Sequence, residues 1–163
     1  MDAFVTAGNA PARESAGRAR GAAGIDNRLD VELGIMRRAV FPGKSGSSNV
    51  AYSPAIVAQG TFLFVSGQVA FDEQGHVVGP GDIGRQATWI FESLGTILRA
   101  ADTDFANVVK TTYYITDVSL FPEVAALRVH YFRAPYPAST VIEVKRLLHP
   151  DLLLEVEAVA MVP

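Results

Sequence analysis

The chain has 163 residues, 49% of them hydrophobic and 19% charged, which is the composition of a single globular domain with a buried core. Its formal net charge of −3 provides no excess of Lys and Arg to neutralise phosphates, so we expect no nucleic-acid partner. The chain lacks Cys, which excludes disulfides and thiolate metal sites, and its His residues lack metal-ligand spacing, so we expect no metal.

The first 49 residues are predicted to be an N-terminal extension that is partly disordered. Residues 1–24 are rich in Ala, Gly and Arg and lack periodic apolar positions, which is typical of a loosely packed tail. Residues 28–40 have apolar side chains at helix-like spacing interrupted by one Gly, so a short helix and a strand both stay open. The turn formers of 41–49 predict a loop, and we expect the compact domain to span 50–163.

The next stretch of the chain predicts a hairpin followed by a helix. Residues 61–71 are aromatic and β-branched, and turn residues at 72–75 join them to a short apolar run at 76–78. Residues 82–101 then carry apolar side chains every three or four positions, which predicts an amphipathic helix.

The remaining third repeats the alternation of strand and helix. Ser119, followed by Pro122 and Glu123, is typical of a helix start, and this second helix is predicted to run to about residue 132. Strands are predicted at 108–117, 139–147 and 152–162, with a turn at 148–151 between the last two. The predicted order after the loop is therefore β-β-α-β-α-β-β.

One face of the predicted sheet has an unusual mixture of side chains. Each helix has one apolar stripe, so we expect an α/β (α+β) fold in which two helices pack on one side of a mixed sheet. On the other side, Glu155 and Glu157 share a strand face with apolar Val159 and Met161. Such a face is a liability when exposed, so we expect another subunit to cover it.

Four ordered blocks of sequence resemble the RidA/YjgF/UK114 family, and together they are more specific than any one motif. The blocks are FVSGQV at 64–69, VKTTYYITD at 109–117, PASTVIEV at 137–144 and LEVEAVA at 154–160. The resemblance implies a chorismate-mutase-like fold and a homotrimer with three clefts between its subunits. It also implies cofactor-free hydrolysis of small enamines and imines such as 2-aminoacrylate.

The resemblance also implies the residues of the cleft. Glu155 matches the family carboxylate proposed to position water or transfer a proton, and Ser66, Gly67 and Gln68 match a substrate-binding block. Ser139 stands where many members carry an Arg that clamps the substrate carboxylate, and a neutral hydroxyl binds a carboxylate more weakly than a guanidinium fork. We therefore expect weak or absent hydrolysis of 2-aminoacrylate.

Structural alternatives stand beside these roles. Glu155 is either an acid/base of the cleft or one half of an ion pair with Lys145 or Arg146 on the neighbouring strand. Gly67 marks either close approach of a ligand or a bulge in the strand. Arg128, on the second helix, is either a replacement cation that binds substrate or a solvated helix residue.

Two functions therefore remain open. The first is an enzyme that acts on an enamine, imine or related unsaturated small molecule, with Glu155 as its acid/base. The second is a non-catalytic trimer that binds small metabolites or a partner protein. No apolar stretch reaches the roughly 18 residues of a membrane span, so we expect no membrane contact and a cytoplasmic location, with no cofactor.

Overall fold

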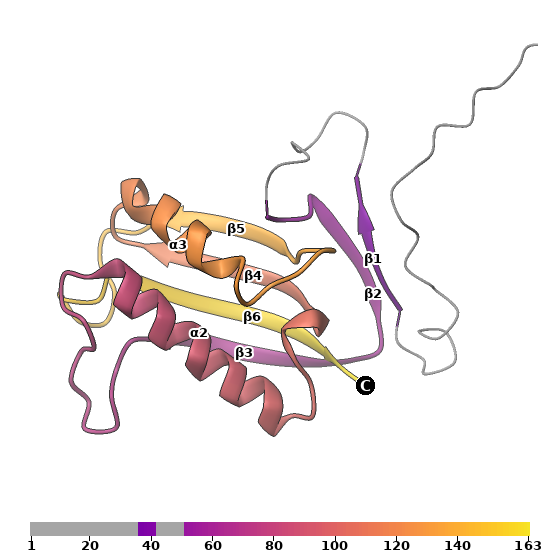
Figure 1. Ribbon diagram of the computed structural model, residues 1–163, viewed down its shortest axis with the longest axis horizontal. Coiled ribbons are helices and arrows are strands. Elements are labelled where there is room, and N and C mark those ends of the chain that lie inside the picture. The colour runs from indigo at the N-terminus through magenta and orange to yellow at the C-terminus, as the bar shows by residue number, and fades with distance from the viewer. Residues whose placement is uncertain (1–35, 42–50) are drawn as a thin grey trace, which may run out of the picture.

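The computed structural model describes residues 36–41 and 51–163. The predicted tail, and the predicted extension apart from 36–41, lie outside the described residues. The helices and strands of the described part, labelled in Figure 1, are β1 (Met36–Val40), β2 (Ala55–Gln59), β3 (Thr61–Val69), α2 (Ile83–Ala100), β4 (Val108–Ile115), α3 (Phe121–Arg128), β5 (Ala138–Glu143) and β6 (Leu154–Val162), with short 3₁₀ turns η1 (Phe105–Asn107) and η2 (Val118–Leu120).

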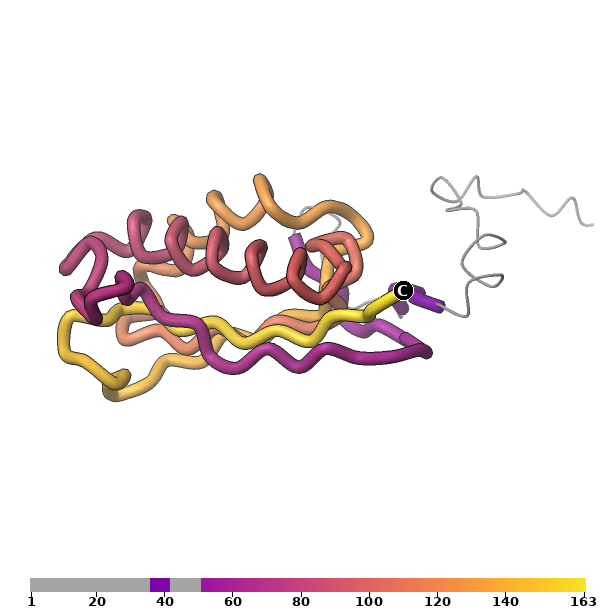
Figure 2. Tube along the Cα trace, turned by 90° about the horizontal axis from the view of Figure 1, so that it is seen from below, coloured from indigo at the N-terminus to yellow at the C-terminus, as the bar shows by residue number. Residues whose placement is uncertain are grey.

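The main body has two layers, a four-stranded sheet with both helices on one face (Figure 2). The strand order is β3-β6-β4-β5. Strands β4 and β5 run parallel because α3 lies in the crossover between them, and the other two pairs are antiparallel. This arrangement confirms the predicted mixed sheet with two helices on one side.

The core lies between α2 and the sheet. The side chain of Asp82 accepts a hydrogen bond of 2.9 Å from the backbone N–H of Arg85 and so caps the first turn of α2. One side of the helix then packs against alternate residues of the strands, because successive strand residues point to opposite faces. The buried apolar side chains of α2, β4 and β6 that form this layer include Ala87, Ile90, Phe91, Leu94, Leu98, Tyr113, Ile115, Leu154, Val156, Ala158 and Ala160.

Three elements differ from the sequence prediction. The short run 76–78 is no strand, since it makes only one isolated bridge, between Val77 and Phe71. The first strand after the loop is instead β2, whose partner β1 lies on the other side of the predicted loop. The second helix ends at Arg128 rather than at 132, because the next backbone bonds, from His130 and Tyr131, reach only three residues back and tighten the chain into a turn.

Residues 36–40, part of the segment for which both a short helix and a strand were open, form the strand β1. It pairs antiparallel with β2, and the two form a ribbon beyond the end of the main sheet (Figure 1). The Arg37 guanidinium donates hydrogen bonds to the backbone oxygens of Ala106 and Pro135. Residues 36–40 therefore pack with the domain, although the sequence placed them in the extension.

A buried Gln86 joins three backbone segments around the start of α2. Its Nε2 donates to the carbonyl oxygens of Gly79 at 3.1 Å and Asp151 at 2.7 Å. Its Oε1 accepts from the N–H of Leu153 at 2.8 Å. This side chain therefore sets where β6 enters the sheet relative to α2.

Replacing Gln86 with Leu is expected to lower the free energy of unfolding by about 2–4 kcal/mol, because it leaves two carbonyls and one N–H unpaired in the interior. Urea denaturation at fixed protein concentration measures the loss. Gln74→Leu, at an exposed turn, is the control and is expected to change stability by less than about 0.5 kcal/mol. An equal effect of the two changes would show that Gln86 is not a structural junction.

Candidate functional site

Glu155 lies on the sheet face that the helices leave open. Its neighbours Leu154 and Val156 are fully buried against the helices, so alternation along β6 directs Glu155 to the opposite side. Partial burial, and in second place the charge of Glu157, raises the pKa of the Glu155 carboxyl above its ordinary value. The side chain is therefore easier to protonate than a solvated Glu.

Gly67 makes the room that Glu155 occupies. The pairing of β3 with β6 shifts register between Val65 and Gln68, so Gly67 lies in a bulge. A methyl group added at Gly67 would lie 1.8 Å from Glu155 Oε1, much closer than the van der Waals contact distance of the two atoms allows. The carboxyl therefore rests against the bulged backbone, a contact between two strands that no local pattern predicts.

The side chains of Ser66 and Gln68, the other two residues of the predicted block, lie on opposite sides of β3. Ser66 is exposed next to the bulge. The amide of Gln68 is used inside the subunit, since its Nε2 donates to the Ser66 carbonyl at 3.1 Å and its Oε1 accepts from Ser93 Oγ at 3.0 Å. The structure thus brings Ser66, Gly67 and Glu155 together, whereas Gln68 ties β3 to α2.

The structural alternative for Glu155 is not found in the described part of the chain. Neither Lys145 nor Arg146 forms an ion pair with it there. Glu157, two residues along the same face, instead accepts a hydrogen bond of 3.0 Å from the Tyr114 hydroxyl. Of the two carboxyls, Glu157 is held within the subunit and Glu155 faces outward beside the bulge.

A second group of predicted residues centres on Arg128. Its side chain is only 4% exposed, so the alternative of a solvated helix residue is wrong. Its Nη2 donates to Ser139 Oγ at 3.0 Å and to the Ala51 carbonyl, and its Cζ lies 5.3 Å from the centroid of the Tyr113 ring. The structure therefore places Arg128, the candidate replacement cation, in contact with Ser139, the position at which many family members carry an Arg.

The two groups lie on opposite faces of the sheet. The Ser139 hydroxyl shares a hydrogen bond of 2.8 Å with that of Thr111, which is fully buried under the helices. Arg128 and Ser139 therefore belong to the helix side, and Glu155 belongs to the open side. Within one chain these residues do not form one site.

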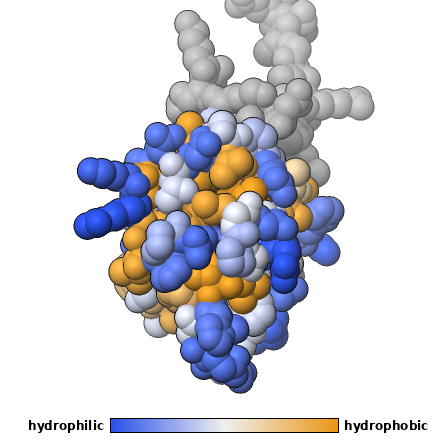
Figure 3. Space-filling view, turned by 90° about the vertical axis from the view of Figure 1, so that its left-hand side faces the viewer, coloured by the Kyte–Doolittle hydropathy of each residue, from blue (hydrophilic) through white to orange (hydrophobic). Residues whose placement is uncertain are grey.

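The open face also carries large exposed apolar side chains. Phe64 is 76% exposed and faces the same side as its cross-strand neighbour Val159. The segment between β5 and β6 forms the left end of the molecule in Figure 1, and Leu148 of this segment is 83% exposed. Hydrophobic surface shows between hydrophilic side chains when that end is viewed directly (Figure 3). Apolar surface therefore exists on the sheet face as well as at the turn before β6.

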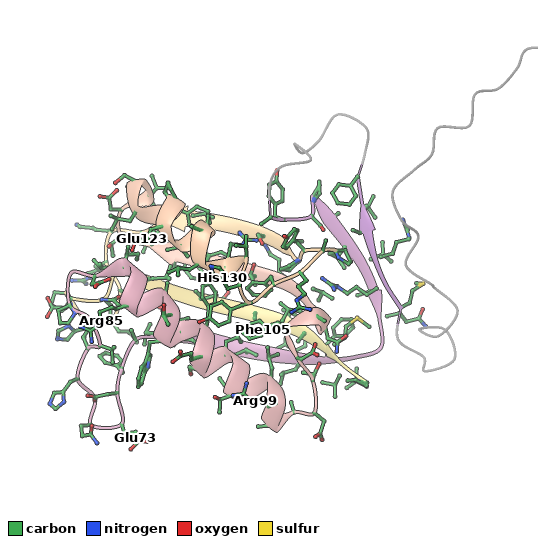
Figure 4. The ribbon with its side chains drawn as sticks, in the orientation of Figure 1. Glu73, Arg85, Arg99, Phe105, Glu123 and His130 are labelled. Atoms are coloured by element: carbon green, nitrogen blue, oxygen red, sulfur yellow. The ribbon has the colours of Figure 1, made fainter. Side chains whose placement is uncertain are left out.

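A hollow of about 650 Å³ is away from both groups. It lies on the outer side of the helices, and its lining includes Arg85 and Trp89 of α2 and Glu123 of α3. Figure 4 shows Arg85 and Glu123 on the exposed side of these helices. Neither Glu155 nor Arg128 lines it, so this hollow is not the predicted cleft.

Comparisons with known proteins agree on one family. Residues 44–162 match the family described as Endoribonuclease L-PSP. A RutC family protein from Synechocystis is 40% identical over 114 residues, 69% of this chain and 86% of the relative. A 2-iminobutanoate/2-iminopropanoate deaminase from Rattus norvegicus is 34% identical over 127 residues, 78% of this chain and 91% of the relative.

The solved structures point the same way. A protein of unknown function of the conserved Rid protein family, from Yersinia pestis, superposes with a TM-score of 0.70 at 30% identity. The match covers 77% of this chain and 98% of that one.

Replacing Glu155 with Gln is expected to stabilise the fold at neutral pH. A carboxyl whose pKa is raised on folding binds its proton more tightly in the folded chain, so it costs stability as pH rises above the unfolded value of about 4.3. The gain from Glu155→Gln is thus expected at pH 7 and should vanish well below pH 4, as measured by urea denaturation across that range. Gly67→Ala, which displaces the carboxyl from the bulge, should reduce the pH dependence of the wild-type chain. A gain from Glu155→Gln that does not change with pH contradicts this account.

Proposed function

The chain belongs to the Rid (YjgF) family, and from that premise we propose that it is a cofactor-free enzyme that hydrolyses the C=N bond of small imines, or of enamines that tautomerise to imines, at clefts between subunits. The observation that carries the proposal is the Glu155 carboxyl, which rests against the bulge at Gly67 with a raised pKa. Carboxyls of this kind, partly desolvated and unpaired, are the usual acids and bases of enzymes. The imine deaminase among its relatives supports the choice of reaction.

The proposed chemistry needs one group that both accepts and donates a proton. Ionised Glu155 takes a proton from a water molecule as the water oxygen bonds to the imine carbon, and the imine nitrogen takes up a proton to give a carbinolamine. The protonated carboxyl then delivers its proton to that nitrogen as the C–N bond breaks. Ammonia leaves and the carbinolamine hydroxyl returns to the solvent the proton that the imine nitrogen first took from it, so a carbonyl forms and R₂C=NH and H₂O become R₂C=O and NH₃. A pKa raised toward the working pH suits both steps.

The separation of the two groups of residues supports a homotrimer. Glu155 and Arg128 lie on opposite faces of one sheet, so a cleft that contains both requires a second copy of the chain. The exposed Phe64 on the open face provides apolar surface for such contact. We therefore propose that each cleft combines the open face of one subunit with the Arg128 side of another.

One observation favours the alternative, a non-catalytic trimer that binds a small molecule or a protein. The Ser139 hydroxyl already bonds to Thr111 and Arg128, which leaves β5 with no free group for a substrate carboxylate at that position. In this alternative the cleft retains affinity but has lost turnover. Ammonia release from 2-iminobutanoate or 2-aminoacrylate generated in solution separates the two functions, and we propose that release is weak with 2-aminoacrylate. The cytoplasmic location stays a prediction.

Glu155→Gln is expected to slow ammonia release from freshly generated 2-iminobutanoate by about 100-fold or more, because Gln keeps the shape of Glu but exchanges no proton. The matched control is Glu157→Gln on the same strand face, whose carboxylate is bonded to Tyr114 and is expected to change the rate by less than about tenfold. Wild-type rates in an intact Glu155→Gln assembly would remove Glu155 from the mechanism. No release by the wild type with any imine would leave the binding function.

Light scattering at micromolar concentration is expected to give a mass of about three times the 17.4 kDa of the chain. Phe64→Glu should shift the mass to that of the monomer, because it places a charge in the proposed apolar contact. Leu148→Glu, at an equally exposed apolar residue away from the open sheet face, is the control and should leave the mass unchanged. A monomeric wild type would refute the composite cleft.

A further inference from the structure

Arg128 is a buried cation without an acidic partner. It is 4% exposed, and it makes no ion pair with any carboxylate among the residues that the structure describes. Its Nε is buried and has no hydrogen-bond partner. Buried charges in proteins are as a rule paired, so this guanidinium has the properties of a group that binds an anion.

The guanidinium is held in one orientation with part of its hydrogen-bonding capacity unused. Both of its hydrogen bonds to described residues leave from Nη2, to Ser139 Oγ and to the Ala51 carbonyl, and the Tyr113 ring lies against it. A guanidinium has five N–H donors in a fixed plane, so the donors of Nε and Nη1 remain. Such a pre-oriented fork matches the two oxygens of a carboxylate.

Ser139 acts on Arg128 rather than on a ligand. Its hydroxyl bonds to Thr111 Oγ1 on β4 and accepts from Arg128 Nη2, so the side chain bridges the sheet and α3. Ser139 is only half-buried, which places the guanidinium just beneath a surface that a small molecule can reach. The hydroxyl therefore fixes the height and tilt of the guanidinium above β5.

We infer that Arg128 is the carboxylate-binding, specificity-determining residue of the cleft and that Ser139 is its positioning residue. The identity of the ligand, a 2-imino or 2-oxo carboxylate, rests on the proposed function. The cation then comes from α3, eleven residues before the strand position at which the sequence analysis sought it. Ser139→Arg would place a second guanidinium against the first, so this change weakens carboxylate binding instead of strengthening it.

The test is calorimetric titration of the full chain with 2-oxobutanoate, which requires no turnover. Arg128→Lys is expected to weaken binding by about 10- to 100-fold, because a point charge replaces the fork. Ser139→Ala should weaken it by about 3- to 10-fold and Ser139→Arg by at least as much. Arg133→Lys, at an exposed position shortly after α3, is the control and leaves the affinity unchanged. Butanone, which lacks the carboxylate, should bind the wild type and Arg128→Lys equally.

The outcomes separate this inference from the proposed function. No binding of 2-oxobutanoate by the wild type, equal binding by Arg128→Lys, or tighter binding by Ser139→Arg overturns the inference. Binding that depends on Arg128 in a chain that releases no ammonia keeps the inference and overturns the proposed enzyme. In an active chain, Arg128→Lys raises KM and Glu155→Gln lowers kcat. If light scattering shows that the Arg128→Lys chain does not assemble, the affinities of Ser139→Ala and Ser139→Arg for 2-oxobutanoate test the inference instead.

Discussion

The alternation of side chains along β6 is the constraint on which both the core and the site depend. This strand lies between β3 and β4, so it has a neighbour on each side and cannot shift its register without moving its whole apolar set out of the core. Burial of Leu154 and Val156 therefore fixes Glu155 on the other face. The apolar packing under the helices is what holds a carboxyl on a surface largely covered with hydrocarbon.

The same constraint explains which parts of the molecule could be predicted from the sequence. The period of α2 and the alternation of β6 are local patterns, and both appear in the structure within two residues of the predicted ends. The glycine at 67 indicates a bulge as one of two alternatives, but its contact with Glu155 depends on the pairing of two strands almost ninety residues apart, which no local pattern encodes. The contact between Arg128 and Ser139 depends on where α3 ends, and helix ends are the least predictable feature of a sequence.

A family-based assignment of roles has the same limit. When this chain is compared with the family one position at a time, Ser139 stands in place of an Arg, and the comparison indicates that a positive charge has been lost. In three dimensions the hydroxyl is bonded to a guanidinium supplied by α3, so a positive charge is present at the place where it was thought to be missing. The residue that substitutes for another need not stand at the same position in the chain. The sequence offers Arg128 as one candidate cation, and the packing of α3 on β5 places it beside Ser139.

The ribbon of β1 and β2 determines where the chain can be shortened. Among the described strands β1 is the only partner of β2, and Arg37 fastens it to backbone oxygens on either side of α3. A chain shortened to begin at residue 50 would keep every strand of the main sheet, but β2 would lose its partner and would present unpaired N–H and C=O groups. Unpaired strands of this kind pair with one another, so such a truncation would make the chain prone to aggregate through β2.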